Sequence, residues 1–503
     1  MPKILFAASE AHPFIKTGGL ADVAGALPIA LQNLGCDIRI VLPAYGDVLR
    51  QYKSMKTVAE FYLPGTAGII RIRATQLKRS KVKVLLVDYP AAFARKGNPY
   101  IDEHGEPWPD NAERFALFCK VIQLIALDQA KLDWKPDLIH CNDWHSALVP
   151  ALLKQIPSAP PSLFTIHNLA YQGLFPQSTF NTLGLPSTLW APHALEFHGQ
   201  LSFIKGGLVF ADRINTVSVQ YAKEIQTPAL GYGLEGLLQH RRHALSGIVN
   251  GIDDSAWNPQ TDKLISQNYT STTLSKKKIN KLALQKLYKL PVDKNVLLLG
   301  FIGRLVEQKG IDLIIELLKS IRHLPIQFCL LGTGDKNYQQ TLSHIAKQNP
   351  EQVSFNIGYS EKLAHQIEAG IDIFLMPSRF EPCGLNQLYS LRYGTVPIVH
   401  NVGGLADTVI DTTPETIKNN TATGFVFNQP TVIAIRQSIN RALKIYSEPK
   451  TWKKLVQNGM KAEFTWDKSA KNYLHLYQEI LKAHNTKQYS IEQNYEPNIR
   501  KEI

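Results

Sequence analysis

The sequence predicts an α/β protein built from two doubly wound domains, and three observations carry this prediction. The chain has 503 residues, 44% of them hydrophobic, which is too long for one ordinary core and sufficient for two. Short apolar runs rich in β-branched residues alternate with stretches of helical spacing. This alternation breaks once, near the middle of the chain, and then resumes.

The predicted strands are continuous apolar runs, which indicate parallel sheets covered by helices on both faces. In the first half of the chain they are KILFAAS, DIRIVLP, VKVLLVD, DLIHCN, SLFTIHN, RINTVS and GIVNG. In the second half they are VLLLGFIGR, IQFCLLG, VSFNIG, IFLMPS, VPIVH and GFVF. Ligands of such sheets bind beyond the carboxyl ends of the strands, so we expect the functional residues there.

The stretch from Gly251 to Lys294 is polar and lysine-rich and separates the two sets of strands. We therefore expect a first domain over 1–250 and a second over 251–463, with the site in a cleft between them. The last 20 residues have few apolar side chains and no clear period, which predicts a flexible tail over 486–503.

The formal net charge of +13 has two explanations: a lysine-rich surface, or attraction of an anionic ligand. Part of the excess is local, because Ser275 to Lys289 carries six lysines at helical spacing, which predicts a solvated helix face. The sequence shows no RRM, zinc-finger or helix-turn-helix signature, so a nucleic-acid partner is not expected.

Five cysteines are scattered without a CxxC pair, which predicts neither a zinc site nor a disulfide framework. The chain starts directly on a strand pattern, with no signal-peptide pattern and no apolar run near the ~20 residues of a membrane helix. We expect a cytoplasmic protein.

The first motif is KTGGLADVAGALPIALQNLG, which follows a strand and opens a helix. Gly18 and Gly19 remove side chains where the chain turns, so backbone N–H groups at the helix start form a seat for an anion. Lys16 adds a mobile positive charge. The alternative is a plain glycine-rich loop, and the spacing is neither GxGxxG nor Walker A, so no ordinary NAD or ATP site is predicted.

The second motif is FIGRLVEQKGIDLIIE, in which Arg304 follows the first strand of the second domain. Lys309 lies five residues later, before a predicted helix. Two cations at a strand exit suit a diphosphate, because arginine offers a planar fork and lysine a point charge. Two unrelated surface cations are the alternative.

Two further strand ends carry histidines. TIHNLAYQG puts His167 beside Asn168, and IHCNDWHSAL puts Asp143 two residues before His145. A lone histidine is often a structural one, whereas a strand end in an α/β domain favours contact with a ligand. Neither segment has HxH or HExxH spacing, so no metal site is predicted.

The fifth motif, SRFEPCGLNQLYSLRYG, is a strand end, a proline-containing loop and a helix predicted to begin at about Gly384. Glu381 is the only acidic residue of the loop, and its carboxylate can accept hydrogen bonds from hydroxyls. Cys383 is an alternative nucleophile, since a helix N-terminus lowers a thiol pKa, but the sequence assigns no histidine as its base. HNVGGLADTV then echoes TGGLADVAG, which indicates two related halves.

Together, KTGGLADV, TIHNLAYQG, IGRLVEQKG, PSRFEPCGLNQL and GGLADTV resemble bacterial glycogen synthases and the related plant starch synthases, in the same order from about Lys3 to Leu481. The resemblance implies a GT-B fold, two Rossmann-like domains around a cleft, with a C-terminal helix at 464–485 crossing back to the first domain. It implies transfer of glucose from ADP-glucose to the non-reducing end of an α-1,4-glucan with retention, without a cofactor or metal.

The resemblance also implies roles for residues that match its motifs. Lys16 contacts the donor, with Gly18 and Gly19 offering N–H groups to the distal phosphate. Arg304 and Lys309 neutralise the leaving ADP. At the glucose end the resemblance implies His167, Glu381, Cys383 and Gly384, and on the adenine it implies Tyr359. The residues implied near the sugar or the acceptor are Asp22, Tyr100, Asp143, Asn168 and Asn250.

In this light Cys383 is a neighbour of the sugar and not a nucleophile. Two routes to retention stay open: Glu381 acting as a far-face nucleophile, or front-face departure through an ion pair with Glu381 binding sugar hydroxyls. The alternatives to an ADP-glucose enzyme are a retaining transferase that uses UDP-glucose and an inactive carbohydrate-binding protein.

Overall fold

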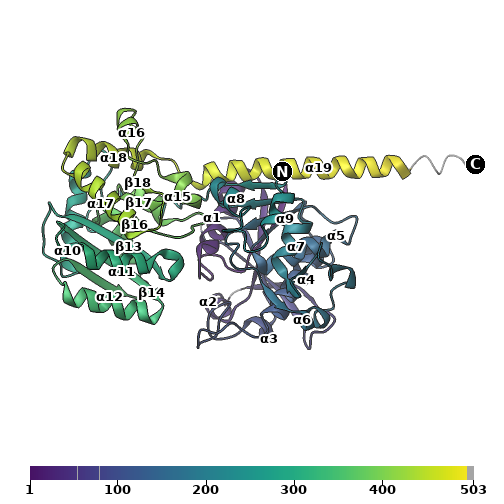
Figure 1. Ribbon diagram of the computed structural model, residues 1–503. Coiled ribbons are helices and arrows are strands. Elements are labelled where there is room, and N and C mark those ends of the chain that lie inside the picture. The colour runs from purple at the N-terminus through teal and green to yellow at the C-terminus, as the bar shows by residue number, and fades with distance from the viewer. Residues whose placement is uncertain (54, 79, 496–503) are drawn as a thin grey trace, which may run out of the picture. The chain divides into compact units, whose positions relative to one another are not determined.

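The computed structural model describes residues 1–53, 55–78 and 80–495, which form two compact units (Figure 1). Unit 1 comprises Met1–Val217, Ala222–Gly251 and the C-terminal segment from Trp466. Unit 2 comprises Ser218–Tyr221 and Ile252–Thr465. Helix α8 (Val219–Glu224) lies where these segments meet along the chain.

Unit 1 is built on a nine-stranded sheet in the order β12-β11-β7-β6-β1-β2-β5-β4-β3. Its strands are β1 (Lys3–Ala7), β2 (Asp37–Pro43), β3 (Lys56–Phe61), β4 (Ile70–Gln76), β5 (Lys83–Asp88), β6 (Leu138–Asn142), β7 (Ser162–Ile166), β11 (Arg213–Thr216) and β12 (Leu245–Gly247). Seven strands pair in parallel, and β3 and β4 add an antiparallel edge. A small second sheet holds β8 (Leu174–Pro176), β9 (Glu196–Phe197) and β10 (Gln200–Ser202).

The helices of unit 1 connect these strands. They are α1 (Gly19–Asn33), α2 (Gly46–Gln51), α3 (Pro90–Phe93), α4 (Asn111–Ala126), α5 (Leu148–Lys154), α6 (Gln177–Thr182), α7 (Phe203–Phe210), α9 (Glu235–His240) and α19 (Trp466–Tyr495), with 3₁₀ turns η1 (Trp144–Ser146) and η2 (Ser187–Leu189).

Six of the seven strands predicted in the first half are confirmed, and two predictions need correction. The run GIVNG is not a strand over its whole length, because β12 covers Leu245–Gly247 and ends where that run begins. The β3–β4 edge was not predicted. Its residues are mostly exposed in β3 and half-exposed in β4, and β4 begins with alternating apolar and charged side chains, IRIRATQ, so the edge lacks the continuous apolar signature of the buried strands.

Unit 2 is built on a six-stranded parallel sheet in the order β15-β14-β13-β16-β17-β18, and all six predicted strands are confirmed. The strands are β13 (Leu297–Leu305), β14 (Ile326–Gly334), β15 (Val353–Ile357), β16 (Ile373–Met376), β17 (Val396–His400) and β18 (Phe425–Phe427). The helices are α10 (Lys277–Leu287), α11 (Ile311–Ser320), α12 (Lys336–Gln348), α13 (Glu361–Gly370), α14 (Asn386–Arg392), α15 (Gly403–Thr408), α16 (Pro414–Lys418), α17 (Val432–Tyr446) and α18 (Pro449–Lys461), with turns η3 (Leu274–Lys276) and η4 (Glu307–Lys309).

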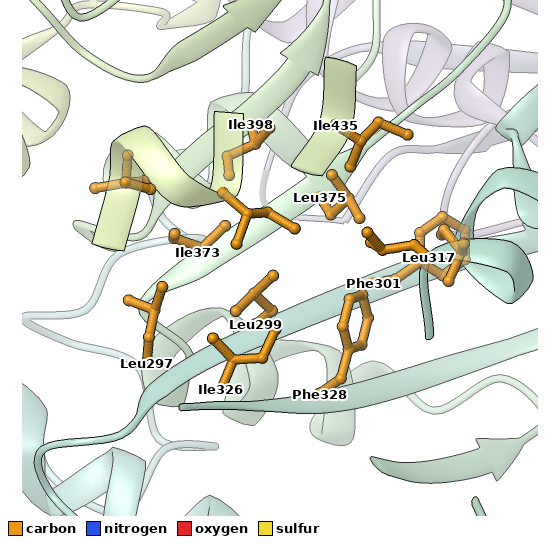
Figure 2. Close-up of a cluster of buried hydrophobic side chains, with 14 of the residues drawn as sticks. Leu297, Leu299, Phe301, Leu317, Ile326, Phe328, Ile373, Leu375, Ile398 and Ile435 are labelled. Atoms are coloured by element: carbon orange, nitrogen blue, oxygen red, sulfur yellow. The ribbon is translucent and has the colours of Figure 1, made fainter. Parts of the chain in front are cut away.

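Both faces of the unit 2 sheet are buried, which explains its continuous apolar strands. On one face, Leu297, Leu299 and Phe301 of β13 pack with side chains of α11 and α17, as Figure 2 shows. On the other face, Leu298 packs in a cluster with Leu284 of α10. Successive side chains of a strand point to opposite faces, so a strand covered on both sides is apolar at most of its positions.

The lysine-rich helix α10 is not a solvated face throughout, which corrects the prediction. Lys277 donates hydrogen bonds to the carbonyls of Glu368 and Ala369 and to Thr395 Oγ1. Lys281 forms an ion pair of 2.6 Å with Asp372 and also donates to Tyr446 Oη. A lysine that reaches carbonyls and a carboxylate can be buried, which the charge pattern alone does not reveal.

Helix α19 is longer than predicted. It begins at Trp466 and continues to Tyr495, so the expected tail from 486 is helical as far as Tyr495, and 496–503 lie outside the described residues. Its first half packs on unit 1, where Tyr473 and Tyr477 are fully buried. Tyr477 Oη lies 2.7 Å from His140 Nδ1, and Asn215 donates to Tyr473 Oη at 3.0 Å.

Within the described residues, the search for a helix of sufficient length and apolarity to span a lipid bilayer finds none.

Candidate active site

Three loops of unit 2 meet at the carboxyl ends of neighbouring strands. The loops follow β13, β16 and β17, which lie side by side in the sheet, so the side chains just beyond their ends come together. The β13 loop carries Lys309, and Arg304 stands at the exposed end of that strand. The β16 loop carries Glu381, and the β17 loop carries the Gly-Gly pair.

Glycines let these three loops pack closely. A Cβ on Gly310, which has φ 68°, would lie 2.3 Å from the carbonyl oxygen of Pro377. A Cβ on Gly403 would lie 2.0 Å from the carbonyl oxygen of Glu381, and one on Gly404 would lie 2.1 Å from that of Cys383. Side chains cannot occupy these positions, so the glycines are required by the packing around the Glu381 loop.

Arg379 ties the β16 loop to α11. Its guanidinium donates to both carboxylate oxygens of Asp312, at 2.8 and 2.7 Å, and its backbone N–H donates to Gln308 O at 2.8 Å. The hydrogen bond from Arg379 lowers the pKa of Asp312. A bidentate pair of this kind fixes direction as well as distance, so the neighbouring Glu381 is held in place.

Glu381 and Lys309 form an ion pair. Lys309 Nζ lies 2.5 Å from Glu381 Oε2, and the hydroxyl of Ser378 donates to the same oxygen at 3.0 Å. The Glu381 side chain is 7% exposed and that of Lys309 is 20% exposed. The site therefore presents a buried carboxyl group whose position is fixed by Lys309 and Ser378.

In unit 1, the glycine-rich loop leads from β1 into α1, which begins at Gly19 with Gly18 as its N-cap. Lys16 Nζ lies 2.6 Å from Asp22 Oδ1. Buried Glu10 accepts hydrogen bonds from the N–H and hydroxyl of Thr17 and from the N–H of Gly18, the last at 3.1 Å. Burial raises the pKa of Glu10.

The Gly18 N–H, predicted to contact a phosphate, therefore already has an internal partner. Gly19 differs, because a Cβ added there would meet nothing within 4 Å among the described residues. Packing does not require glycine at this position, which leaves the backbone of Gly19 open to a close ligand.

His167 stands just after β7 and contacts Asn142, the last residue of β6, and Asp143, which follows that strand. Its Nε2 lies 2.9 Å from Asn142 Oδ1, and its backbone N–H donates to Asp143 Oδ1 at 2.7 Å. Burial lowers the pKa of His167 to about 3 and raises that of Asp143 to about 7. Asp143 has φ 54° and ψ −179°, a region nearly restricted to glycine that costs of order 1–3 kcal/mol. Such strain is typical of functional positions.

Comparison with known proteins covers both halves of the chain. Residues 3–240 match the family model of the starch synthase catalytic domain, and residues 285–461 match that of glycosyl transferases group 1. Glycogen synthase 1 of Methylococcus capsulatus is 53% identical over 483 residues, 96% of this chain and 97% of the relative. Glycogen synthase of Cellvibrio japonicus is 52% identical over 482 residues, 95% of this chain and 100% of the relative. The chain belongs to the starch and glycogen synthase family.

Two solved structures share the fold of this chain, which is a member of the starch and glycogen synthase family. The catalytic domain of starch synthase IV from Arabidopsis thaliana, bound to ADP and acarbose, has a TM-score of 0.86 and 32% identity over 96% of this chain and 99% of that chain. Sucrose-phosphate synthase from Thermosynechococcus elongatus shares the fold alone, with a TM-score of 0.58 and 18% identity. The prediction of a GT-B fold with two Rossmann-like units is confirmed.

The remaining predicted residues of this family member have distinct surroundings. Tyr100 Oη lies 2.7 Å from Ser9 Oγ, and its ring stacks on His145 at 4.5 Å between centroids. His145 is buried, and burial holds its pKa well below the usual range, so it is a core histidine. Asn250 is buried, and its Oδ1 has no hydrogen-bond partner within the described residues. Asn168 donates to Asp143 at 3.4 Å.

In unit 2, Tyr359 follows β15 and is 74% exposed, an accessible aromatic ring. Cys383 is buried, which is typical of an unreactive thiol and not of a nucleophile. Helix α14 begins at Asn386 and not at about Gly384, because Gly384 has φ 73° and the Gln387 amide donates to the carbonyls of Cys383 and Gly384.

Sequence reasoning missed the residues that hold the predicted ones. These are Glu10 under the glycine-rich loop, Asn142 beside His167, and Ser378 and Arg379 around Glu381. Each is a polar residue in or beside a strand end, and that position was the feature of the sequence that could have identified it. Their partners, however, are set by which strands are neighbours in the sheet.

Proposed function

We propose that this chain is an ADP-glucose-dependent glucan synthase. It transfers glucose from ADP-glucose to the non-reducing end of an α-1,4-glucan and retains the anomeric configuration. Support comes from the family match over nearly the whole chain and from the solved starch synthase bound to ADP and acarbose. The observation that carries the proposal is the cluster of Arg304, Lys309 and Glu381 at neighbouring strand ends of unit 2.

Arg304 and Lys309 bind the diphosphate of the donor. As the bond between glucose and phosphate breaks, negative charge grows on the ADP oxygens. Fixed cations stabilise that charge more strongly in the transition state than in the ground state, which accelerates the reaction. Exposed Tyr359 stacks on the adenine ring of the same nucleotide.

Glu381 holds the transferred glucose. In the described part of the chain, both contacts of its carboxylate use Oε2, so Oε1 can accept a hydrogen bond from a sugar hydroxyl. Its charge also lies close to the positive charge that develops on the sugar ring. A carboxylate already engaged by Lys309 and Ser378 is a weak nucleophile, which favours front-face departure over a covalent intermediate.

The residues of unit 1 contact the sugar and the acceptor. Lys16 and the backbone of Gly19 contact the donor, and His167 lies beside the transferred glucose. A pKa of about 3 keeps His167 neutral at physiological pH, so it orients hydroxyls and does not act as an acid. The acceptor hydroxyl loses its proton to the departing phosphate. The residues that hold the acceptor are Asp22, Tyr100, Asp143, Asn168 and Asn250.

The test is incorporation of radiolabelled glucose from ADP-glucose into glycogen, with UDP-glucose as the matched donor. The proposal expects elongation with ADP-glucose at a far higher kcat/KM, and new linkages that an α-1,4-specific amylase digests. A preference for UDP-glucose would instead indicate another retaining transferase. Binding of glycogen without elongation would indicate an inactive carbohydrate-binding protein.

We also propose that the reaction takes place in the cytoplasm. All five cysteines are free and buried, which suits a reducing compartment. Fractionation of cells with an antibody to the chain tests this, and recovery in an oxidising compartment would contradict it.

A further inference from the structure

A column of buried polar side chains runs through the centre of the unit 1 sheet to His167. His140 and Asn142 lie on one face of β6, and Thr165 lies on β7 beside them, all fully buried. His140 Nε2 is 2.8 Å from Thr165 Oγ1, and its Nδ1 is 2.7 Å from Tyr477 Oη. Asn142 is the end of the column, and its side chain lies against His167.

The orientation of the Asn142 amide is fixed by its other contacts. Its NH₂ group donates to the carbonyl of Ala7 at 3.0 Å and lies 3.5 Å from the carbonyl of His140. Reversing the amide would place its oxygen against these two acceptors, which is unfavourable. The atom that faces His167 Nε2 at 2.9 Å is therefore Oδ1, which only accepts.

A hydrogen on His167 Nε2 follows from this geometry, because a contact of 2.9 Å to an acceptor needs a donor. The second ring nitrogen, Nδ1, has no hydrogen-bond partner among the described residues. The backbone N–H of His167 is held separately by Asp143. The ring thus has one nitrogen committed to Asn142 and one nitrogen available to a ligand.

We propose that Asn142 is a positioning residue that holds His167 in its Nε2–H tautomer and leaves Nδ1 as a hydrogen-bond acceptor. The inference rests on the proposed function, since it gives a role to His167 beside the transferred glucose. Asn142 itself contacts no substrate. It sets the direction of the imidazole ring and the nitrogen that can receive a hydroxyl hydrogen.

The charged and titratable groups around the ring support a neutral His167. Asp143 accepts the His167 backbone N–H and not the ring. His140 lies farther along the column, and Tyr473 and Tyr477 face His140 from α19. Glu10 bonds to the glycine-rich loop. Burial keeps the pKa of His167 low, so no second ring hydrogen competes for Nδ1.

The experiment uses the full chain with Asn142→Leu and Asn142→Asp, and Asn215→Leu as the matched control. Asn215 is equally buried in the same sheet, on β11, two strands from β6, and it donates to Tyr473, not to His167. Nitrogen-15 spectra of labelled histidine, assigned by difference from His167→Gln, report the tautomer. Steady-state kinetics report kcat and the KM for ADP-glucose, and calorimetry reports ADP affinity.

Asn142→Leu is expected to lose the single Nε2–H tautomer and to lower kcat by about 10- to 100-fold, because the ring is no longer aligned. ADP affinity is expected to stay unchanged. Asn142→Asp places a carboxylate against Nε2, which raises the pKa of His167 and adds an ionisation to the kcat–pH profile, with activity lost below it. Asn215→Leu is expected to lower stability without changing the tautomer.

An Nε2–H tautomer and a kcat that both survive in Asn142→Leu would overturn the inference. If that variant does not fold, an Asn142→Asp profile identical to the wild type would overturn it. The nitrogen-15 spectra are recorded without turnover, so the test of the positioning role of Asn142 is independent of the test of the proposed function. An inactive wild type whose tautomer depends on Asn142 would reject the proposed function and leave the positioning role intact.

Discussion

Glu381 shares its carboxylate oxygen Oε2 with Lys309 and Ser378, so its charge and that of Lys309 act as a unit. We expect Glu381→Gln to lower kcat by roughly 100- to 1,000-fold, the range for removing one group that stabilises a transition state. ADP affinity should stay equal or increase, because Lys309 is released toward the phosphates. Radiolabel incorporation and calorimetry measure the two effects.

Lys309→Ala is the counterpart variant, expected to raise the KM for ADP-glucose. The double variant should be less impaired than the product of the single effects, since each partner alters the other. Near-normal turnover of a well-folded Glu381→Gln variant would remove Glu381 from the site.

A substitution at Gly19 tests whether this glycine is needed for contact with a ligand or for packing of the fold. Gly19→Ala adds a Cβ that meets nothing within 4 Å in the described chain and improves helix propensity at the first residue of α1. We expect an unchanged or slightly higher melting temperature and a clear loss of kcat/KM. Gly25→Ala is the contrast, because its Cβ would lie 2.5 Å from His12 O and should destabilise the fold. Full activity of Gly19→Ala would show that no ligand approaches there.

Asp143 links the site to the pH dependence of stability. Its pKa is raised to about 7, whereas an unfolded aspartate titrates near 3.9. The folded chain binds this proton more tightly, so the contribution of Asp143 to the free energy of unfolding is full below about pH 4 and is lost as the pH rises through about 7.

Asp143→Asn removes that titration. The free energy of unfolding of the wild type, relative to this variant, should fall between about pH 4 and pH 7, as measured by urea denaturation at several pH values. Comparison with the variant cancels the other titrating groups. Parallel curves for the two proteins would contradict the raised pKa.

At the scale of elements, helix α10 shows how a charge pattern can mislead. Lys281 is 3% exposed, pairs with Asp372 and reaches Tyr446, whereas Lys278 three residues earlier is exposed. Removing one partner of a buried pair leaves the other uncompensated, which costs about 3–5 kcal/mol. We expect that loss for Lys281→Met and a change within about 0.5 kcal/mol for Lys278→Met. Equal stabilities by chemical denaturation would place Lys281 in solvent.

The strands were the most predictable elements. Continuous apolar runs such as IFLM at β16 and VPIVH at β17 are typical of a strand covered on both faces. The β3–β4 edge escaped because a half-exposed antiparallel strand needs fewer apolar residues. The length of α19 was not predicted because its later residues have few apolar side chains and no clear period in the sequence.

At the scale of the whole molecule, the net charge of +13 attracts the donor electrostatically if that donor is an anionic nucleotide sugar. We expect the KM for ADP-glucose to rise several-fold between about 0.1 M and 1 M salt, where the screening length falls from about 10 to about 3 Å. The KM for glycogen, which is uncharged, should change little. Arg304→Gln should weaken the salt dependence, and an equal salt effect on both substrates would refute the electrostatic explanation.

The sequence by itself determined the two α/β units, most of their strands and the identity of the residues at strand ends, because local periodicity and glycine positions encode them directly. Only the tertiary structure decided which side chains contact one another at the site. Lys309 and Glu381 are 72 residues apart in the chain and meet because β13 and β16 are neighbours in the sheet. Asn142 and His167 meet for the same reason on β6 and β7. The order of strands follows from packing over the whole core, which no local pattern of residues contains.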